Sequence, residues 1–180
     1  MSLLEIAKAI DATALSTSLK TISWIIPLMQ CFHVLMVGVV FVSILMITLR
    51  VLGRVRNDEP LSQTWNRFAP FLWSGIVVMV VSGVLLVIAE PVRELMALSF
   101  RLKMLLLLIC VISAAFFGRI MRGASLAAAV ETLLPAGIRL TAVVTLALWI
   151  AIIVFGRTIA YDDSVWGEWS PAVLQRGAGT

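Results

Sequence analysis

His33 is the single histidine in the chain, and it lies in a run of apolar residues that is long enough to cross a membrane. Because an ionisable ring in hydrocarbon is costly, such a residue marks a candidate functional site. Met29, His33 and Met36 have the i, i+4, i+7 spacing of one helix face, and Gln30 precedes His33 by three residues. The segment from Trp24 to His33 amounts to about 13 Å of helix, which puts the ring near the middle of the bilayer.

Haem b is the first cofactor that this pattern allows. Imidazole is the commonest proximal haem ligand, and Met79, at a matching depth in a later span, is the candidate for the second axial position. The propionates of a haem would need cationic partners, which Arg101, Lys103 and Arg157 offer about two turns nearer the membrane surface. A second histidine, which a bis-histidine site requires, is missing from the sequence.

Two other ligands and one structural role fit the same residues. Cu(I) prefers thioether and imidazole ligands, and Met29, His33 and Met36 supply both. A quinone or similar lipophilic molecule would accept a hydrogen bond from His33 or Gln30 in a pocket between helices. Alternatively, His33 only joins helices, by hydrogen bonding to a backbone carbonyl, to Gln30 or to Ser82 on a facing span.

The elements that must position these residues are membrane spans. Hydrophobic residues make up 61% of the chain and charged residues 13%, and the mean hydropathy is +1.06, all far outside the range of soluble proteins. At about 20 helical residues per crossing, the sequence predicts an all-α, four-helix transmembrane bundle that forms a single membrane domain over residues 1–180. The predicted spans cover residues 22–50, 70–90, 95–119 and 139–161.

Shorter segments flank the predicted spans. Apolar residues recur on one stripe of residues 2–15, which predicts a short helix in the membrane interface that ends at the Ser-Thr-Ser sequence of residues 16–18. Residues 162–180 form a polar tail that we expect on the surface. Cys31 and Cys110 fall inside spans, where we expect both to be buried as small apolar side chains.

Charged residues cluster where short loops force neighbouring spans to alternate in direction. One membrane side then collects Glu90, Arg101, Lys103, Arg157 and Tyr161. This group is an ionic cluster or anion site above His33, a set of side chains that extend to lipid headgroups, or a contact for a partner subunit. The arginine-rich loops on the other side predict that those loops are cytoplasmic and that both termini lie on the non-cytoplasmic side.

The sequence also argues against several functions. The net charge of +4 arises from Arg and Lys in short loops, which is typical of helix flanks beside lipid, so no nucleic-acid partner is expected. The sequence contains no Ser/His/Asp arrangement, phosphate loop or pair of catalytic carboxylates. Stand-alone catalysis is therefore not expected.

The chain resembles a family of uncharacterised four-span bacterial inner-membrane proteins over most of residues 15–161. The similar stretches are Trp24 to His33, Leu49-Arg50, Ser99 to Leu106 and Gly156 to Tyr161. The resemblance implies the four-span fold, a bacterial inner membrane and the same choice of site residues, but no reaction. The chain is similar, more weakly, to copper-resistance permeases and b-type cytochromes, which generally use more than one histidine.

We therefore expect an integral membrane protein that serves as a non-catalytic subunit or anchor of a larger assembly, such as a respiratory complex, with a haem or quinone site near His33. The alternatives are a small permease for copper or another solute and a purely structural membrane protein. Besides the lipid bilayer, the expected partners are other membrane subunits or further copies of the chain.

Overall fold

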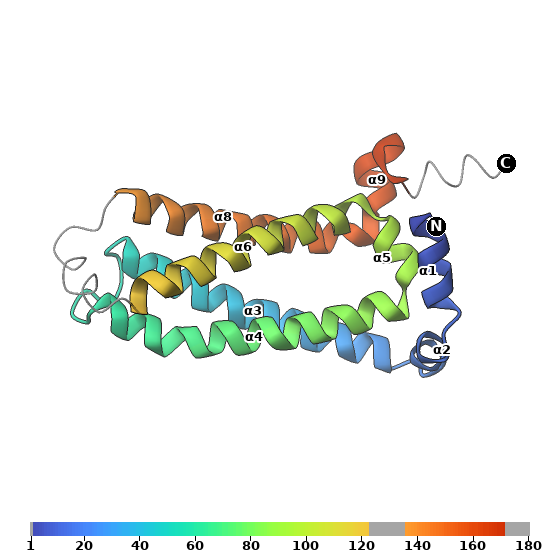
Figure 1. Cartoon of the computed structure of the whole chain (residues 1–180), viewed down its shortest axis with the longest axis horizontal. Coiled ribbons are helices and arrows are strands. Elements are labelled where there is room, and N and C mark those ends of the chain that lie inside the picture. The colour runs from blue at the N-terminus through green and yellow to red at the C-terminus, as the bar shows by residue number, and fades with distance from the viewer. Residues whose placement is uncertain (1, 123–135, 172–180) are drawn as a thin grey trace.

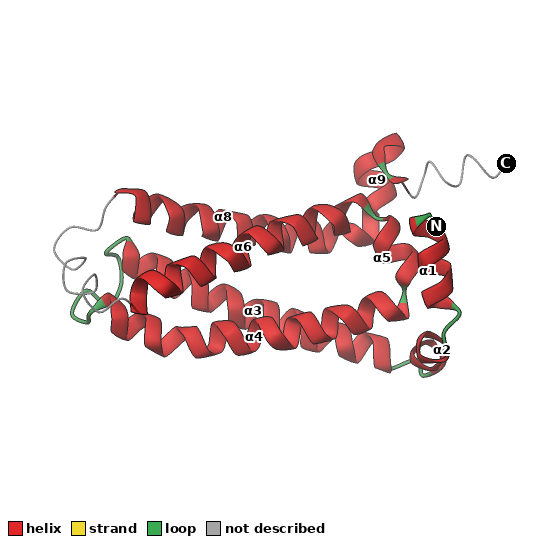
Figure 2. Cartoon of the chain, in the orientation of Figure 1, coloured by secondary structure: helices red, strands yellow, loops and turns green. Residues whose placement is uncertain are grey.

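A four-helix bundle forms the body of the molecule. The computed structural model describes residues 2–122 and 136–171, and every regular element within them is a helix (Figure 2). Apolar segments in lipid must satisfy their backbone groups internally, which favours helices. Among the described residues, four helices are long and apolar enough to span a membrane. They are α3 (Ile25–Val51), α4 (Leu61–Ala89), α6 (Leu98–Arg122) and α8 (Ala136–Thr158). The predicted all-α fold class is confirmed.

The four long helices form two pairs. α3 packs along α4 and α6 packs along α8, while α8 also contacts α3. The two pairs diverge toward the end of the bundle that carries α5 (Pro91–Met96), as Figure 1 shows. Both pairs contribute side chains to one apolar core. Its most deeply buried members include Val40, Leu72, Cys110 and Trp149.

Gly75 sets the distance between α3 and α4. A Cβ atom at this position would lie 2.7 Å from Cγ2 of Val40, whose side chain is fully buried. Gly75→Ala must therefore shift Val40 or separate the helices, and we expect it to lower the free energy of unfolding by about 2 kcal/mol. Gly137→Ala is the matched control, because a Cβ at Gly137 meets no atom within 4 Å. Equilibrium unfolding in mixed micelles measures both variants, and equal effects would contradict the close packing at Gly75.

Two short helices lie across the diverging end of the bundle (Figure 1). α1 (Leu3–Asp11) and α2 (Ala14–Thr21) replace the single helix predicted for residues 2–15. The first helix ends before Thr13 because this residue caps the start of α2. Its side chain accepts a hydrogen bond from Ser16 N at 3.3 Å. The predicted end of the helix at residues 16–18 is therefore wrong. α1 packs against α5 and α2 against α4.

The boundaries of the spans also differ from the prediction. α4 begins at Leu61, directly after Pro60, and continues through Pro70, which is the predicted start of this span. Pro70 removes one intrahelical hydrogen bond, which membrane helices tolerate where neighbours compensate. The predicted third span begins inside the separate helix α5, at its last turn, and α6 follows from Leu98. α8 begins at Ala136, three residues before the predicted start of the fourth span.

The segment after α8 is folded and partly buried. η1 (Ile159–Tyr161), α9 (Asp162–Trp166) and η2 (Gly167–Trp169) follow α8 without a break. Asp162 is 5% exposed and Ser170 is 0% exposed, so the prediction of a polar surface tail is wrong for these residues. Residues 163–165 and 167–169 of that predicted tail are exposed, and residues 172–180 lie outside the described residues.

The two cysteines differ in their surroundings. Cys110 is buried in the core, as predicted from its place in a span. Cys31 is exposed on the outer side of α3, so the prediction that it is buried is wrong. Periodicity alone does not separate the two, because both the inner and the outer faces of a membrane span are apolar.

An ion pair and a backbone contact hold the loop between α3 and α4 at the opposite end of the bundle. Arg56 donates to the Glu59 carboxylate at 2.6 Å, and Arg50 donates from Nε to the Glu59 carbonyl at 3.0 Å. The hydrogen bond from Arg56 holds the pKa of Glu59 below its usual value. These contacts connect the end of one span to the start of the next.

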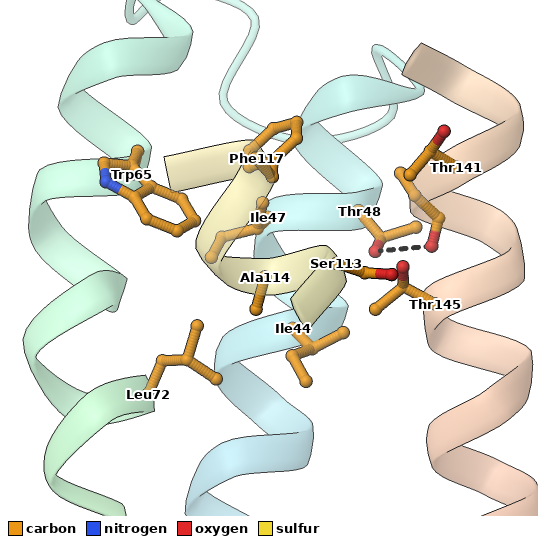
Figure 3. A pocket seen from close by; sticks show the side chains of 11 residues that line it. Ile44, Ile47, Thr48, Trp65, Leu72, Ser113, Ala114, Phe117, Thr141 and Thr145 are labelled. Carbon is orange, nitrogen blue, oxygen red and sulfur yellow. Dashed lines mark hydrogen bonds between the residues drawn. The ribbon is translucent and has the colours of Figure 1, made fainter. Parts of the chain in front are cut away.

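A small cavity lies between the helices near this loop. Ile44, Trp65 and Phe117 border it, and Thr48 Oγ1 donates to the carbonyl of Ala142 at 3.3 Å along its edge (Figure 3). Its volume of about 40 Å³ suffices for a water molecule but is far below that of a ligand pocket. We interpret it as a gap in helix packing.

Candidate functional site

Ser82 of α4 holds the ring of His33, which lies on α3 in the diverging half of the bundle. The Nδ1 atom of His33 is 2.9 Å from Ser82 Oγ. Ser82 Oγ in turn donates to the carbonyl of Val78 at 2.8 Å, and the carbonyl of Met79 is 3.2 Å away. A hydrogen bond to Ser82 on a facing span is one of the alternatives that the sequence allows. This contact orients the ring and does not use its second nitrogen, Nε2.

The Ser82 hydroxyl determines what His33 offers at Nε2. A serine hydroxyl carries a single proton, which here has three acceptors within reach: the carbonyls of Val78 and Met79, and Nδ1 of His33. When the proton is donated to Val78, Nδ1 carries the imidazole proton and Nε2 is an acceptor. When it is donated to Nδ1, the imidazole proton lies on Nε2, which becomes a donor. The neutral ring thus presents either kind of group to a ligand.

Gly83 leaves room for the His33 ring beside α4. A Cβ atom at Gly83 would lie 3.3 Å from Cε1 of His33. Gly83→Ala is therefore expected to displace the ring and to weaken its hydrogen bond to Ser82, at a cost of about 1 kcal/mol. Because His33 is the single histidine, imidazole nitrogen chemical shifts from isotope-labelled protein report on this bond directly. The shifts should change in Gly83→Ala and stay the same in Gly137→Ala; unchanged shifts in both variants would show that the ring is not confined by Gly83.

Lys103 of α6 is half-buried inside its membrane span. Its Nζ atom lies beside Gly156 of α8, 3.6 Å from the position that a Cβ atom would take there, which is an ordinary van der Waals distance. The ammonium group interacts electrostatically with His33 and with Glu94 of α5. It makes no hydrogen bond, and no ion pair within 4 Å, to any residue that the structure describes. A half-buried cation of this kind in a membrane span marks a functional site.

Glu94 is a charged residue near the site that is not among the predicted site residues. It lies on the short helix α5, outside the membrane spans, and is half-buried. Burial raises the pKa of its carboxyl group, while the charge of Lys103 acts in the opposite direction. The sequence does contain a signal for helix α5, the dipeptide Glu90-Pro91, because proline is favoured at the first position of a helix.

The predicted ionic cluster is not assembled among the described residues. Glu90 pairs with Arg93 at 2.6 Å and not with the basic residues of α6 or α8. Three further members of the predicted cluster are exposed: Arg101, Arg157 and Tyr161. Lys103 turns inward because it is two residues from Arg101 on α6, and such residues point to different sides of a helix. Arg101 donates from Nε to the carbonyl of Leu95 at 3.2 Å, and the alternative in which the exposed members extend to lipid headgroups stays a prediction.

The other predicted ligands lie on α3 and α4. Met29 and Met36 are half-buried beside His33, and Gln30 is exposed on the outer side of α3. Met79 is 4% exposed, and its side chain is packed in the core. Within residues 2–122 and 136–171, no group of three or more His, Cys, Asp or Glu side chains is arranged to hold a metal ion.

A buried carboxylate connects the segment after α8 to the start of α6. Asp162 accepts hydrogen bonds from the backbone nitrogens of Leu98 at 3.1 Å and Ser99 at 2.9 Å. It also accepts from the hydroxyl groups of Ser99 at 2.7 Å and Ser170 at 2.6 Å. Asp162 thus caps the first turn of α6 from a distant part of the chain, and its charge suits the positive end of that helix. We assign Asp162 a structural role: it holds the first turn of α6, which precedes Lys103.

An open groove lies at the same end of the molecule. It runs between α1, α5 and the segment that follows α8, and its volume is about 740 Å³. Met96 and Ile159 are among the residues that line it, and Ile159 follows Gly156 on the chain by three residues. The groove therefore lies about one helical turn nearer the end of the bundle than Lys103. Its volume is that of pockets for small organic molecules.

The fold and the site define a multi-pass integral membrane protein in which two ionisable side chains of the spans, His33 and Lys103, are half-buried near one another. Comparisons with protein-family models, with curated proteins and with solved structures give no significant match. The functional assignment therefore depends on the geometry of the site.

Proposed function

We propose that this chain is a non-catalytic membrane subunit that binds a quinone between its two helix pairs, at His33 and Lys103. The observation that carries the proposal is the placement of these two side chains. His33 is oriented by Ser82 with Nε2 not used in that contact, and the ammonium group of Lys103 makes no hydrogen bond to the described residues. A quinone head group carries two carbonyl oxygens on opposite sides of a flat ring, and two donors on different helices, α3 and α6, match it.

The Ser82 hydroxyl supports the choice of a quinone over other lipophilic ligands. An oxidised quinone needs hydrogen-bond donors, whereas its reduced form carries hydroxyl groups and also needs an acceptor. His33 meets both needs, because reorientation of the Ser82 proton between Val78 and Nδ1 changes Nε2 from acceptor to donor. The site therefore binds both the oxidised and the reduced quinone without a change in the net charge of its own side chains.

Haem is the less favoured of the two predicted cofactors. Its propionates would require several cations, but Arg101 and Arg157 are exposed and Lys103 alone turns inward. The predicted second axial ligand, Met79, is packed in the core of the bundle. The donor set at the site therefore fits two carbonyl groups better than a metalloporphyrin.

The subunit role follows from the chemistry of quinones. Their reduction and oxidation require an electron donor or acceptor, which we propose to be a redox centre of a partner subunit. This chain would then bind and orient the quinone in the bilayer. We further propose a bacterial inner membrane as its location, with the arginine-rich loops in the cytoplasm and the termini on the other side. Residues 123–135 of the second such loop lie outside the described residues.

Substitution of His33 tests the proposal. We expect His33→Phe, which keeps the ring but removes both nitrogens, to weaken the binding of a short-chain ubiquinone or menaquinone analogue about tenfold. Quenching of tryptophan fluorescence in nanodiscs measures the affinity, because the chain contains six tryptophans. Thr141→Val, which removes a polar group from the small cavity at the opposite end, is the control and should leave the affinity unchanged. Equal affinity for wild type and His33→Phe would contradict the proposal.

A further inference from the structure

The outer face of the first half of α3 is exposed over several turns. Val34 is 66% exposed and Val42 is 51% exposed, and Gln30 and Gly38 are exposed on the same side. These four residues have i, i+4, i+8, i+12 spacing and form one continuous ridge along the helix. A ridge of this kind either faces lipid or packs against another helix.

Gln30 distinguishes this ridge from the lipid-facing sides of the other spans. Its amide lies about 9 Å from Trp24 along the helix, inside the apolar region, and makes no hydrogen bond to another described residue. Two exposed hydroxyl groups on other spans behave differently, since Ser74 donates to the carbonyl of Phe71 and Thr141 donates to that of Gly137. An amide cannot be left unpaired in hydrocarbon without cost, so Gln30 requires a partner from outside the chain.

Gly38 allows that partner to come close. A Cβ atom at Gly38 would meet nothing within 4 Å, so this glycine is not needed for contacts inside the chain, in contrast to Gly75 and Gly118. Small residues at exposed positions of membrane helices let a second helix approach the backbone. Gly38 follows Gln30 by two positions of the same ridge, so both side chains face the same neighbour.

We propose that this neighbour is α3 of a second copy of the chain, and that the protein is a homodimer with Gln30 and Gly38 at its interface. Copies that insert in the same orientation are related by a twofold axis along the membrane normal, which brings residues of equal depth together. A carboxamide is both donor and acceptor, so Gln30 pairs with Gln30 of the partner subunit without any other group. Packing of four-residue ridges gives the crossing that small-residue membrane dimers adopt.

Counting copies in lipid vesicles tests the dimer. Full-length protein with a single fluorophore is reconstituted at high dilution, and photobleaching steps give the fraction of dimers. We expect mostly two-step traces for wild type and a roughly tenfold weaker association for Gln30→Leu and for Gly38→Ile. Ser74→Leu removes an exposed polar group from another span and should not change the fraction. A monomeric wild type, or variants that dimerise as well as wild type, would overturn the proposal.

Cross-linking through Cys31 tests which face of α3 forms the dimer interface. It is exposed next to Gln30, whereas Cys110 is buried. Oxidation of membranes with copper phenanthroline should give a disulfide-linked dimer in Cys110→Ser and none in Cys31→Ser. A cross-link that persists in Cys31→Ser, or one that fails to form in Cys110→Ser, would place the contact elsewhere and overturn the proposal. The dimer and the quinone site are tested separately, because Gln30→Leu leaves His33 and Lys103 in place.

Discussion

Asp162→Ala is expected to lower the free energy of unfolding by about 3 kcal/mol, because it removes a buried carboxylate that accepts four hydrogen bonds. Two of these bonds satisfy backbone nitrogens in the first turn of α6, and both donors would be left without this partner. The loss also releases the segment after α8 from α6. Reversible unfolding in mixed detergent micelles measures the change.

Two further variants separate capping from a general effect of mutation at this end. Asp162→Asn keeps an acceptor oxygen but loses the charge, so its stability should fall between that of wild type and Asp162→Ala. Glu168→Ala changes an exposed acidic residue of the same segment and should cost less than about 1 kcal/mol. If Asp162→Ala and Glu168→Ala were equally stable, the assignment of Asp162 as the cap of α6 would be wrong.

Lys103→Met is expected to weaken quinone binding by about tenfold to a hundredfold, the largest functional effect of a single substitution in this protein. Hydrogen bonds from a charged donor contribute about 1.5–3 kcal/mol, which corresponds to this range of affinity. Methionine matches the length of the aliphatic chain and keeps the contact with Gly156. Arg157→Met, which removes an exposed cation next to that glycine, is the matched control and should not change the affinity.

The stability of Lys103→Met provides a second readout. A half-buried ammonium group with no ion pair to the described residues destabilises the fold, so its removal should raise the free energy of unfolding while affinity falls. A general structural defect would lower both quantities. A variant that is less stable and binds less well would therefore indicate that Lys103 supports the fold and does not bind the ligand.

The sequence predicts the bundle well because hydropathy and helix length respond directly to the bilayer. Four apolar runs of sufficient length require four helices, and the structure contains them. It does not predict the role of Asp162, since this side chain caps a helix that begins 64 residues earlier. Thr13 and Pro91 are local helix-start signals, and reading them would have predicted α2 and α5.

The site is predicted in part. The cost of an imidazole in hydrocarbon singles out His33, and a hydrogen bond to Ser82 on a facing span is one of the roles that the sequence allows for it. Which cation turns inward depends on how α6 is rotated against α8, where Lys103 lies beside Gly156. A count of charges on one membrane side contains no such information, so Lys103 could not be separated from Arg101 and Arg157.

Photolabelling with a quinone analogue tests the central claim most directly, because it locates the ligand. A photoreactive quinone is bound to the full-length protein in nanodiscs, illuminated, and mapped by peptide mass spectrometry, with unlabelled quinone as competitor. If the quinone binds at His33 and Lys103, the label is found on α3 near His33 and on α6 near Lys103, and unlabelled quinone suppresses it. Neither label is expected in Lys103→Met. Competed labelling confined to the groove beside α1 and α5, or to the small cavity at the opposite end, would contradict the assignment of the site.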